Sequence, residues 1–345
     1  MNRLGGAAAC KRVLGFFGYP ILVMKRLDGL DALRGIAALV VLLFHAWKFF
    51  GGTTAVAEGW LAVDFFFALS GFVMARTYEA RMVDWRGFMK LRFRRFWPMV
   101  LIGGSLGLPV LYFKLGVAAI PIALLNLAFI PFFFDGDIFP LNGPFWSLFY
   151  ELYANAAHAL VFRRFRDKHL AIGIAVLAVS MAVLGNHFGS LNIGASPRTF
   201  VAGFARVLLP YLIGVLLYRR WRDEPPLRVP QVLTPMLLPI LVIAASAVPG
   251  WMPQLAFVLV GVPLLLMGGI RLQAGILGRW LGLISFPLYA VHVPILVLCR
   301  GFGIGEVAAI ALALAIAWGV AWCLELPSRE RKSRPNSASE PSTAQ

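Results

Sequence analysis

The sequence is short of charged residues, and this shortage excludes an ordinary soluble domain. Only 14% of the 345 residues are charged and 60% are hydrophobic, against about 45–50% apolar residues in a typical soluble domain. Among the charged residues the acidic ones are in the minority, 16 against 32 Lys and Arg, which leaves a net charge of +16. The basic residues stand in short clusters between apolar runs, which indicates membrane topology rather than nucleic-acid binding. We therefore expect an integral membrane protein whose partner is the lipid bilayer. We do not expect it to bind nucleic acid.

Cysteine is scarce as well. Cys10, Cys299 and Cys323 show neither the spacing of metal ligands nor a paired framework. We expect no metal site, no redox chemistry and no permanently bound cofactor.

Long apolar runs, by contrast, are abundant. Eleven stretches come near the roughly 20 residues that a helix needs to cross a bilayer; they are 32–50, 59–76, 96–113, 117–134, 144–162, 169–187, 200–218, 232–249, 253–270, 281–299 and 303–324. If all crossed, the basic cluster 163–168 and the basic loop 76–95 would lie on opposite sides. The stretch 117–134 contains Pro121 and Pro131, and a proline-broken segment is tolerated when it is re-entrant or interfacial. We therefore do not count it as a span.

The sequence thus predicts an all-α, polytopic membrane helix bundle of about ten transmembrane helices plus one re-entrant or interfacial segment. The basic loops and both termini then share one side, which the positive-inside rule makes cytoplasmic. Residues 27–326 form the membrane domain. Residues 1–26 are a leader without a convincing cleavage site, with translation starting at Met1 or Met24, and 327–345 are a disordered tail rich in Ser, Pro, Arg and Glu.

His45 is an ionisable residue inside an apolar run, and Arg34 lies eleven residues before it. At about 100° per residue, eleven residues end about 20° past three full turns, so both side chains share one helix face. Asp31 lies within about 40° of the same line. Ionisable groups within a span are costly and mark functional sites, and an imidazole can accept a proton at physiological pH. His45 is therefore a candidate general base; the alternative is a packed histidine bonded to a backbone carbonyl.

Four more ionisable residues, on four other apolar stretches, are predicted to share the depth of His45 in the outer third of the bilayer; they are Asp64, Glu151, Arg206 and His292. A lone membrane carboxylate must be protonated or paired, and Asp64 has two candidate partners, His45 and Arg206. Glu151 could equally pair with Arg206.

Three further patterns leave a structural and a functional interpretation open. Glu151 begins a polar stripe that either joins helices or lines a cavity. Tyr289 and His292 share a helix face, where they either pack or contact a substrate. Arg92 and Arg95 lie one turn apart at the end of a basic loop, a fork that suits phosphate groups or anchors the chain at anionic lipid.

Together these motifs resemble the acyltransferase-3 family of bacterial membrane acyltransferases, which modify surface polysaccharides, lipid-linked sugars, nodulation signals and some antibiotics. The matching segments are Asp31–Gly35 with His45, Asp64–Phe66 with Ser70–Phe72, Arg92–Arg95 with Pro98, Trp146–Leu148 with Glu151, and Tyr289 with His292. The resemblance implies an acyl-CoA donor that enters from the cytoplasm, His45 as the catalytic base, and Arg92 and Arg95 as donor contacts.

On this basis we expect O-acyl transfer from acetyl-CoA, or another acyl-CoA, to a hydroxyl of a carbohydrate or glycolipid acceptor at the bacterial inner membrane. The expected catalytic residues are His45 and Asp64, with Asp64 orienting the imidazole; the donor-binding residues are Arg34, Arg92 and Arg95; the acceptor-binding residues are Glu151, Arg206, Tyr289 and His292. We expect the chain to work alone, with a partner protein or as a homo-oligomer. The rival expectation is a proton-coupled transporter or lipid-linked sugar flippase, which the lack of an evident inverted repeat disfavours.

Overall fold

The computed structural model describes residues 27–325, apart from 53, 80–83, 135 and 223. Within these residues the chain forms helices and no strand, as predicted. The predicted leader, 1–26, and the predicted tail, 327–345, lie outside the described residues.

The main helices, in chain order, are α2 (Asp28–Phe50), α3 (Ala62–Tyr78), α4 (Trp85–Leu115), α5 (Ala119–Leu127), α6 (Phe145–Leu160), α7 (Asp167–Phe188), α8 (Phe200–Trp221), α9 (Thr234–Ala247), α10 (Trp251–Ala256), α11 (Val262–Arg271), α12 (Gly275–Gly301) and α13 (Glu306–Val320). A short π-helix, Phe257–Gly261, joins α10 to α11, and another, Ala321–Glu325, follows α13.

Eight helical segments of the described chain are long and apolar enough to cross a membrane. The protein is therefore a multi-pass membrane protein. Two helices between these segments are shorter, α6 with 16 residues and α9 with 14. The predicted count of ten spans depends on these two.

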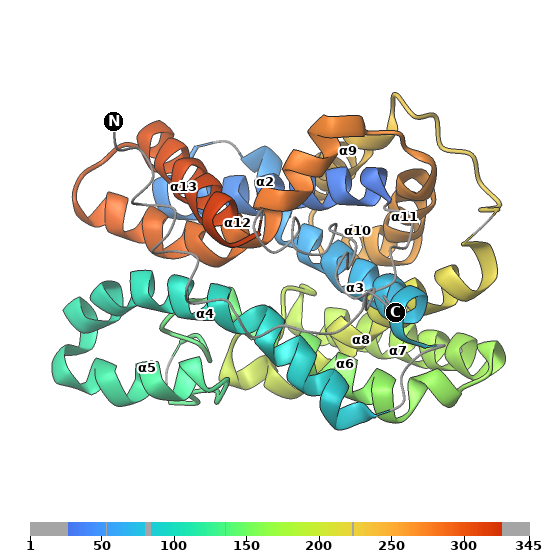
Figure 1. The fold of residues 1–345 in the computed structure, drawn as a ribbon, viewed down its shortest axis with the longest axis horizontal. Helices are drawn as coiled ribbons and strands as arrows, with labels where there is room; N and C mark the ends of the chain where they lie inside the picture. Colours follow the sequence, from blue (N-terminus) through green and yellow to red (C-terminus); the bar gives the residue numbers. More distant parts are fainter. Residues whose placement is uncertain (1–26, 53, 80–83, 135, 223, 326–345) are drawn as a thin grey trace, which may run out of the picture.

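The segment that we did not count as a span folds back on its predecessor. Gly116 has a φ of +60°, a conformation that glycine adopts without a steric penalty, and the chain reverses there between α4 and α5 (Figure 1). The nine residues of α5 extend about 14 Å, half of the roughly 30 Å hydrocarbon core. Beyond α5, the amide of Leu141 donates to Asn126 Oδ1 at 3.1 Å, which fastens the loop that leads into α6.

The bundle has two layers with α3 between them (Figure 1). One layer holds α2, α12 and α13 together with α9–α11, and the other holds α4–α8. Glycines let the helix backbones approach closely: a Cβ on Gly35 of α2 would overlap Leu281 of α12, and a Cβ on Gly71 of α3 would overlap the Tyr211 carbonyl of α8. Small residues commonly mediate such packing in membranes.

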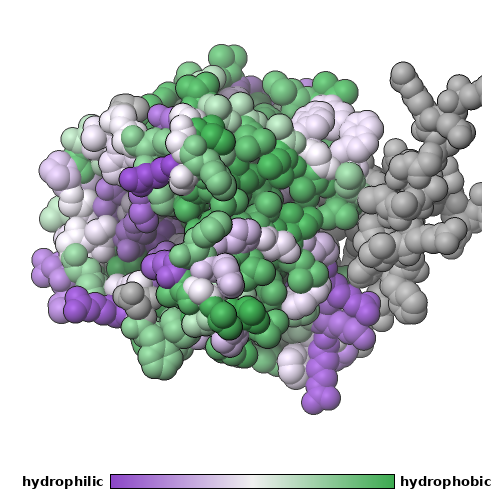
Figure 2. All heavy atoms as spheres, turned by 90° about the vertical axis from the view of Figure 1, so that its left-hand side faces the viewer, coloured by the Kyte–Doolittle hydropathy of each residue, from purple (hydrophilic) through white to green (hydrophobic). Residues whose placement is uncertain are grey.

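The two ends of the bundle differ in charge. We call the end where α6 meets α7 and α8 meets α9 the basic end, at the right in Figure 1; its basic residues include Arg163, Arg164, Arg166, Lys168, Arg219, Arg220, Arg222 and Arg228. The opposite end carries the α4–α5 and α12–α13 turns. Figure 2 views this opposite end, where hydrophobic residues cover the middle and hydrophilic residues gather in patches at the left and lower right.

Candidate active site

His45 of α2 lies against His292 of α12 near the opposite end. The His45 Nδ1 atom is 3.2 Å from His292 Nε2, and the two rings meet edge to face with centroids 4.9 Å apart. His45 Nδ1 is also 3.0 Å from the carbonyl oxygen of Val41, one turn earlier in α2. The ring is thus held by its Nδ1 side.

The hydrogen bonds define which nitrogen of His45 is basic. A carbonyl oxygen only accepts, so the contact with Val41 requires the proton of a neutral His45 ring to be on Nδ1. Nε2 then carries the free lone pair. Among the described residues no side chain or backbone group bonds this Nε2, and the His45 side chain is partly exposed. The arrangement suits proton abstraction.

Asp64 does not contact His45. Its Oδ1 atom accepts a hydrogen bond from Arg206 Nε at 3.1 Å, and both side chains are buried, with 1% and 2% exposed. The guanidinium lies between the rings of Trp60 and Trp146, 4.5 and 4.9 Å from their centroids. The structure therefore selects Arg206 from the two partners considered for Asp64, and the side chain within hydrogen-bond distance of His45 is His292.

Glu151 of α6 belongs to a second polar cluster. Its Oε1 atom accepts hydrogen bonds from Ser70 of α3 at 2.6 Å and from Arg92 of α4 at 3.0 Å. The pairing of Glu151 with Arg206 that we considered is therefore wrong. Glu151 is thus held beside Arg92, in the second turn of α4 and far from His45 along the bundle. The expectation that Glu151 shares the depth of His45 is therefore also wrong.

The two arginines expected to form a surface fork lie in different surroundings. Arg92 is buried, with 4% exposed, and its guanidinium covers the Phe96 ring. Arg95 is exposed and has no hydrogen bond or ion pair within the described residues. The two guanidinium groups nevertheless remain within electrostatic range of each other.

Arg34 joins α2 to α12. Its Nε donates to Ser285 Oγ at 2.8 Å, Nη2 donates to the Gly282 carbonyl, and Nη2 forms an ion pair with Asp31 at 3.1 Å. Arg34, expected to bind the donor, is thus engaged by Asp31 of its own helix and by two groups of α12. Arg34 therefore stabilises the helix that carries His45.

Polar side chains connect the two clusters along the bundle. Tyr289 lies one turn before His292 on α12, with ring centroids 5.8 Å apart. Its hydroxyl is 2.6 Å from Ser147 Oγ on α6, and Glu151 follows Ser147 by one turn. Polar side chains spaced about one helical turn apart thus lie between His45 and Arg92.

Some residues that build the site were missed in the sequence. Trp60, Trp146 and Ser147 were not given roles, although Trp146 and Ser147 lie in a segment that matched the family. Asn142 was missed too; its Nδ2 donates to the Ala290 carbonyl at 2.8 Å. Pro294 lacks the amide hydrogen that would normally bond this carbonyl. Pro294 was therefore the residue in the sequence that could have indicated a side-chain donor for the Ala290 carbonyl.

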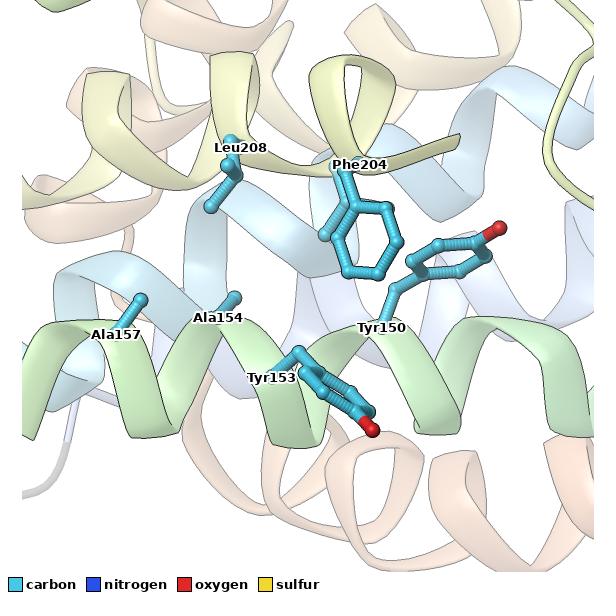
Figure 3. A pocket seen from close by; sticks show the side chains of 7 residues that line it. Tyr150, Tyr153, Ala154, Ala157, Phe204 and Leu208 are labelled. Carbon is cyan, nitrogen blue, oxygen red and sulfur yellow. The ribbon is translucent and has the colours of Figure 1, made fainter. Parts of the chain in front are cut away.

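A small apolar pocket lies between α6 and α8 (Figure 3). It has a volume of about 150 Å³ and is lined by Tyr150, Tyr153, Ala154, Ala157, Phe204, Val207 and Leu208. Its walls are almost entirely apolar. The ionisable side chains named above are not among its lining residues.

One cluster of charged residues at the basic end ties three helices together. Glu79, just beyond α3, accepts hydrogen bonds from Nε and Nη2 of Arg219 at 3.0 and 2.6 Å, and lies 3.3 Å from His158 Nε2 of α6. Burial alone would raise the pKa of Glu79, but hydrogen bonds from His158 and Arg219 outweigh it and hold the pKa below its ordinary value. This cluster is structural.

These features define a multi-pass membrane protein with a buried polar centre that reaches a partly exposed imidazole. The chain belongs to the acyltransferase-3 family: residues 27–326 match its acyltransferase domain. The protein is thus an acyltransferase, and the predicted family is confirmed.

One relative is a protein of Rhizobium radiobacter described as "Protein 2 in picA locus". It is 36% identical over 183 residues, which cover 46% of this chain and 94% of the relative. No solved structure matches the chain.

Proposed function

We propose that the protein transfers an acyl group, with acetyl as the first candidate, from acyl-CoA to a hydroxyl of a carbohydrate or glycolipid, using His45 as the general base. The observation that carries this proposal is the surroundings of the Nε2 atom of His45. It combines a free lone pair, a ring held in place through Nδ1, and partial exposure. A base needs these three properties.

The reaction balances with His45 alone as the proton carrier. Nε2 takes the proton of the acceptor hydroxyl while that oxygen attacks the thioester carbonyl carbon. The carbon–sulfur bond then breaks, and the CoA thiolate takes the proton from the imidazolium to leave as the free thiol. General base catalysis of this kind contributes about 10² to 10⁴-fold.

The donor would bind from the basic end, which the positive-inside rule assigns to the cytoplasm. CoA carries phosphate groups, and arginine binds phosphate through paired hydrogen bonds. Arg95 is exposed, and Arg92 has a buried Nε without a hydrogen-bond partner in the described chain. Arg34 lies about 16 Å from His45 along α2, a distance that the extended pantetheine arm of CoA can bridge.

The acceptor would bind around Tyr289, beside the His45 ring pair. Arg206 is engaged in a buried ion pair and Glu151 in a partly buried one, so their proposed contribution is to shape the site. The transporter alternative receives no support from the family assignment.

The test is acyl transfer by the purified protein in lipid nanodiscs. Release of CoA thiol from acetyl-CoA is measured with an envelope glycan extract of the bacterium that carries the gene. His45→Ala should lose about 10²-fold or more of the rate. His187→Ala is the matched control, because His187 is an exposed histidine at the end of α7. Wild-type activity of folded His45→Ala would refute the proposed base.

A further inference from the structure

His292 is held in one orientation by the backbone of its own helix. Its side chain is buried, with 1% exposed, and Nδ1 lies 3.0 Å from the Leu288 carbonyl oxygen and 2.9 Å from that of Tyr289. Both partners only accept, so Nδ1 carries the proton of the neutral ring. Nε2 is therefore an acceptor, and it points at His45 Nδ1 from 3.2 Å.

We propose that His292 is a positioning residue that orients His45 and stabilises its protonated form. This inference rests on the proposed function and replaces two expectations, the acceptor-binding role of His292 and the orienting role of Asp64. The His45 Nδ1–H group has two acceptors, the Val41 carbonyl and His292 Nε2. Together they fix the rotation of the ring and keep the basic nitrogen on the open side.

The pair also explains how a positive charge can form there. When Nε2 of His45 takes a proton, the Nδ1–H hydrogen bonds become charge-assisted and roughly twice as strong as neutral ones. His292 supplies this stabilisation as a neutral acceptor. A carboxylate in its place would carry the high cost of a buried charge within a membrane helix, and Asp64 offsets that cost by pairing with Arg206.

The competing role for His292 is purely structural. Its Nδ1–H group could serve only to fasten a turn of α12 that lies between Pro287 and Pro294. The two roles use different ring nitrogens. The structural role needs the donor at Nδ1, whereas the positioning role needs the acceptor at Nε2.

Two amide substitutions separate these nitrogens. In His292→Asn the amide nitrogen can replace the Nδ1 donor, but no acceptor reaches His45. In His292→Gln the amide oxygen can replace the Nε2 acceptor, while the donor to the Leu288 carbonyl is lost. The assay is CoA thiol release from acetyl-CoA with the envelope glycan extract, giving kcat and KM for both substrates, alongside the melting temperature of each variant.

The proposal predicts that kcat falls at least about tenfold in His292→Asn, with KM values near those of wild type, and that His292→Gln recovers most of this loss. Cys299→Ser, at another buried position of α12, is the matched control and should keep its kcat. Equal kcat in the Asn and Gln variants, better activity of the Asn variant, or a loss confined to KM of the glycan would overturn it. Those results leave the His45 proposal intact, because only an active His45→Ala variant refutes the base itself.

Discussion

The Asp64–Arg206 ion pair offers the sharpest test of the difference between a structural and a chemical role. The perturbation is Asp64→Asn, which keeps the side-chain volume but removes the charge. Arg206 would retain its bonds to the Ile193 carbonyl at 2.8 Å and to Asn192 Oδ1 at 3.3 Å. Its positive charge would lie between two tryptophan rings without a carboxylate.

The magnitude follows from burial. Both side chains are at most 2% exposed, and removing one partner of a buried ion pair costs about 3–5 kcal/mol, because the other charge remains uncompensated. At about 1.4 kcal/mol per factor of ten, the folding equilibrium shifts by about 10² to 10⁴-fold. Arg206→Met should cost less, since an unpaired carboxyl can take up a proton whereas a guanidinium cannot lose one.

The double variant completes the cycle. Asp64→Asn with Arg206→Met removes both charges, so no uncompensated charge remains buried. We therefore expect its melting temperature in detergent to lie above that of Asp64→Asn. The assay is intrinsic fluorescence melting, with acetyl transfer normalised to folded protein.

A different outcome would refute this reasoning. If Asp64→Asn kept the wild-type melting temperature but lost kcat, Asp64 would act on the chemistry, for instance by orienting His45, and the ion pair would not be its main role.

Two further predictions test the donor site and the helix packing. Arg95→Ala should raise KM for acetyl-CoA severalfold without lowering the melting temperature, because Arg95 is exposed; an unchanged KM across a salt series would contradict a phosphate contact. Gly71→Val should abolish the monodisperse peak in size-exclusion chromatography, because even a Cβ there overlaps the Tyr211 carbonyl, whereas Gly319→Ala, with nothing within 4 Å, should elute as wild type. Normal folding of Gly71→Val would show that α3 and α8 are not closely packed there.

The sequence predicted the helices well, because spans follow from apolar length and from the side of the basic clusters. It also predicted that 117–134 does not cross, from Pro121 and Pro131. It placed Arg34, Asp31 and His45 on one helix face correctly, since that relation is internal to α2.

The sequence did not predict which residues of different helices pair with one another. Asp64 had two plausible partners, and only the packing of α3 against α8 selects Arg206. Likewise, the distance of 3.2 Å between His45 and His292 depends on how α2 lies along α12. The periodicity of each helix determines on which helix face a residue lies. Which neighbouring helix that face contacts depends on glycines such as Gly35 and on the side chains that surround them.

The error about the depth of Glu151 has a specific cause in the segment 117–134, which folds back on α4. Counting residues from the end of a span gives depth only if the span begins at the membrane surface. His45 lies about 26 Å from the start of α2, at about 1.5 Å per residue. Glu151 lies only about 14 Å from the end of α6 at the basic end, and Arg92 about 10 Å from the start of α4. Since α5 and the loop after it lie before α6 toward the opposite end of the bundle, α6 begins farther from that end and has only 16 residues. The folded-back segment thereby places Glu151 beside Arg92, well away from His45 along the bundle, and separates the proposed donor contacts from the proposed base.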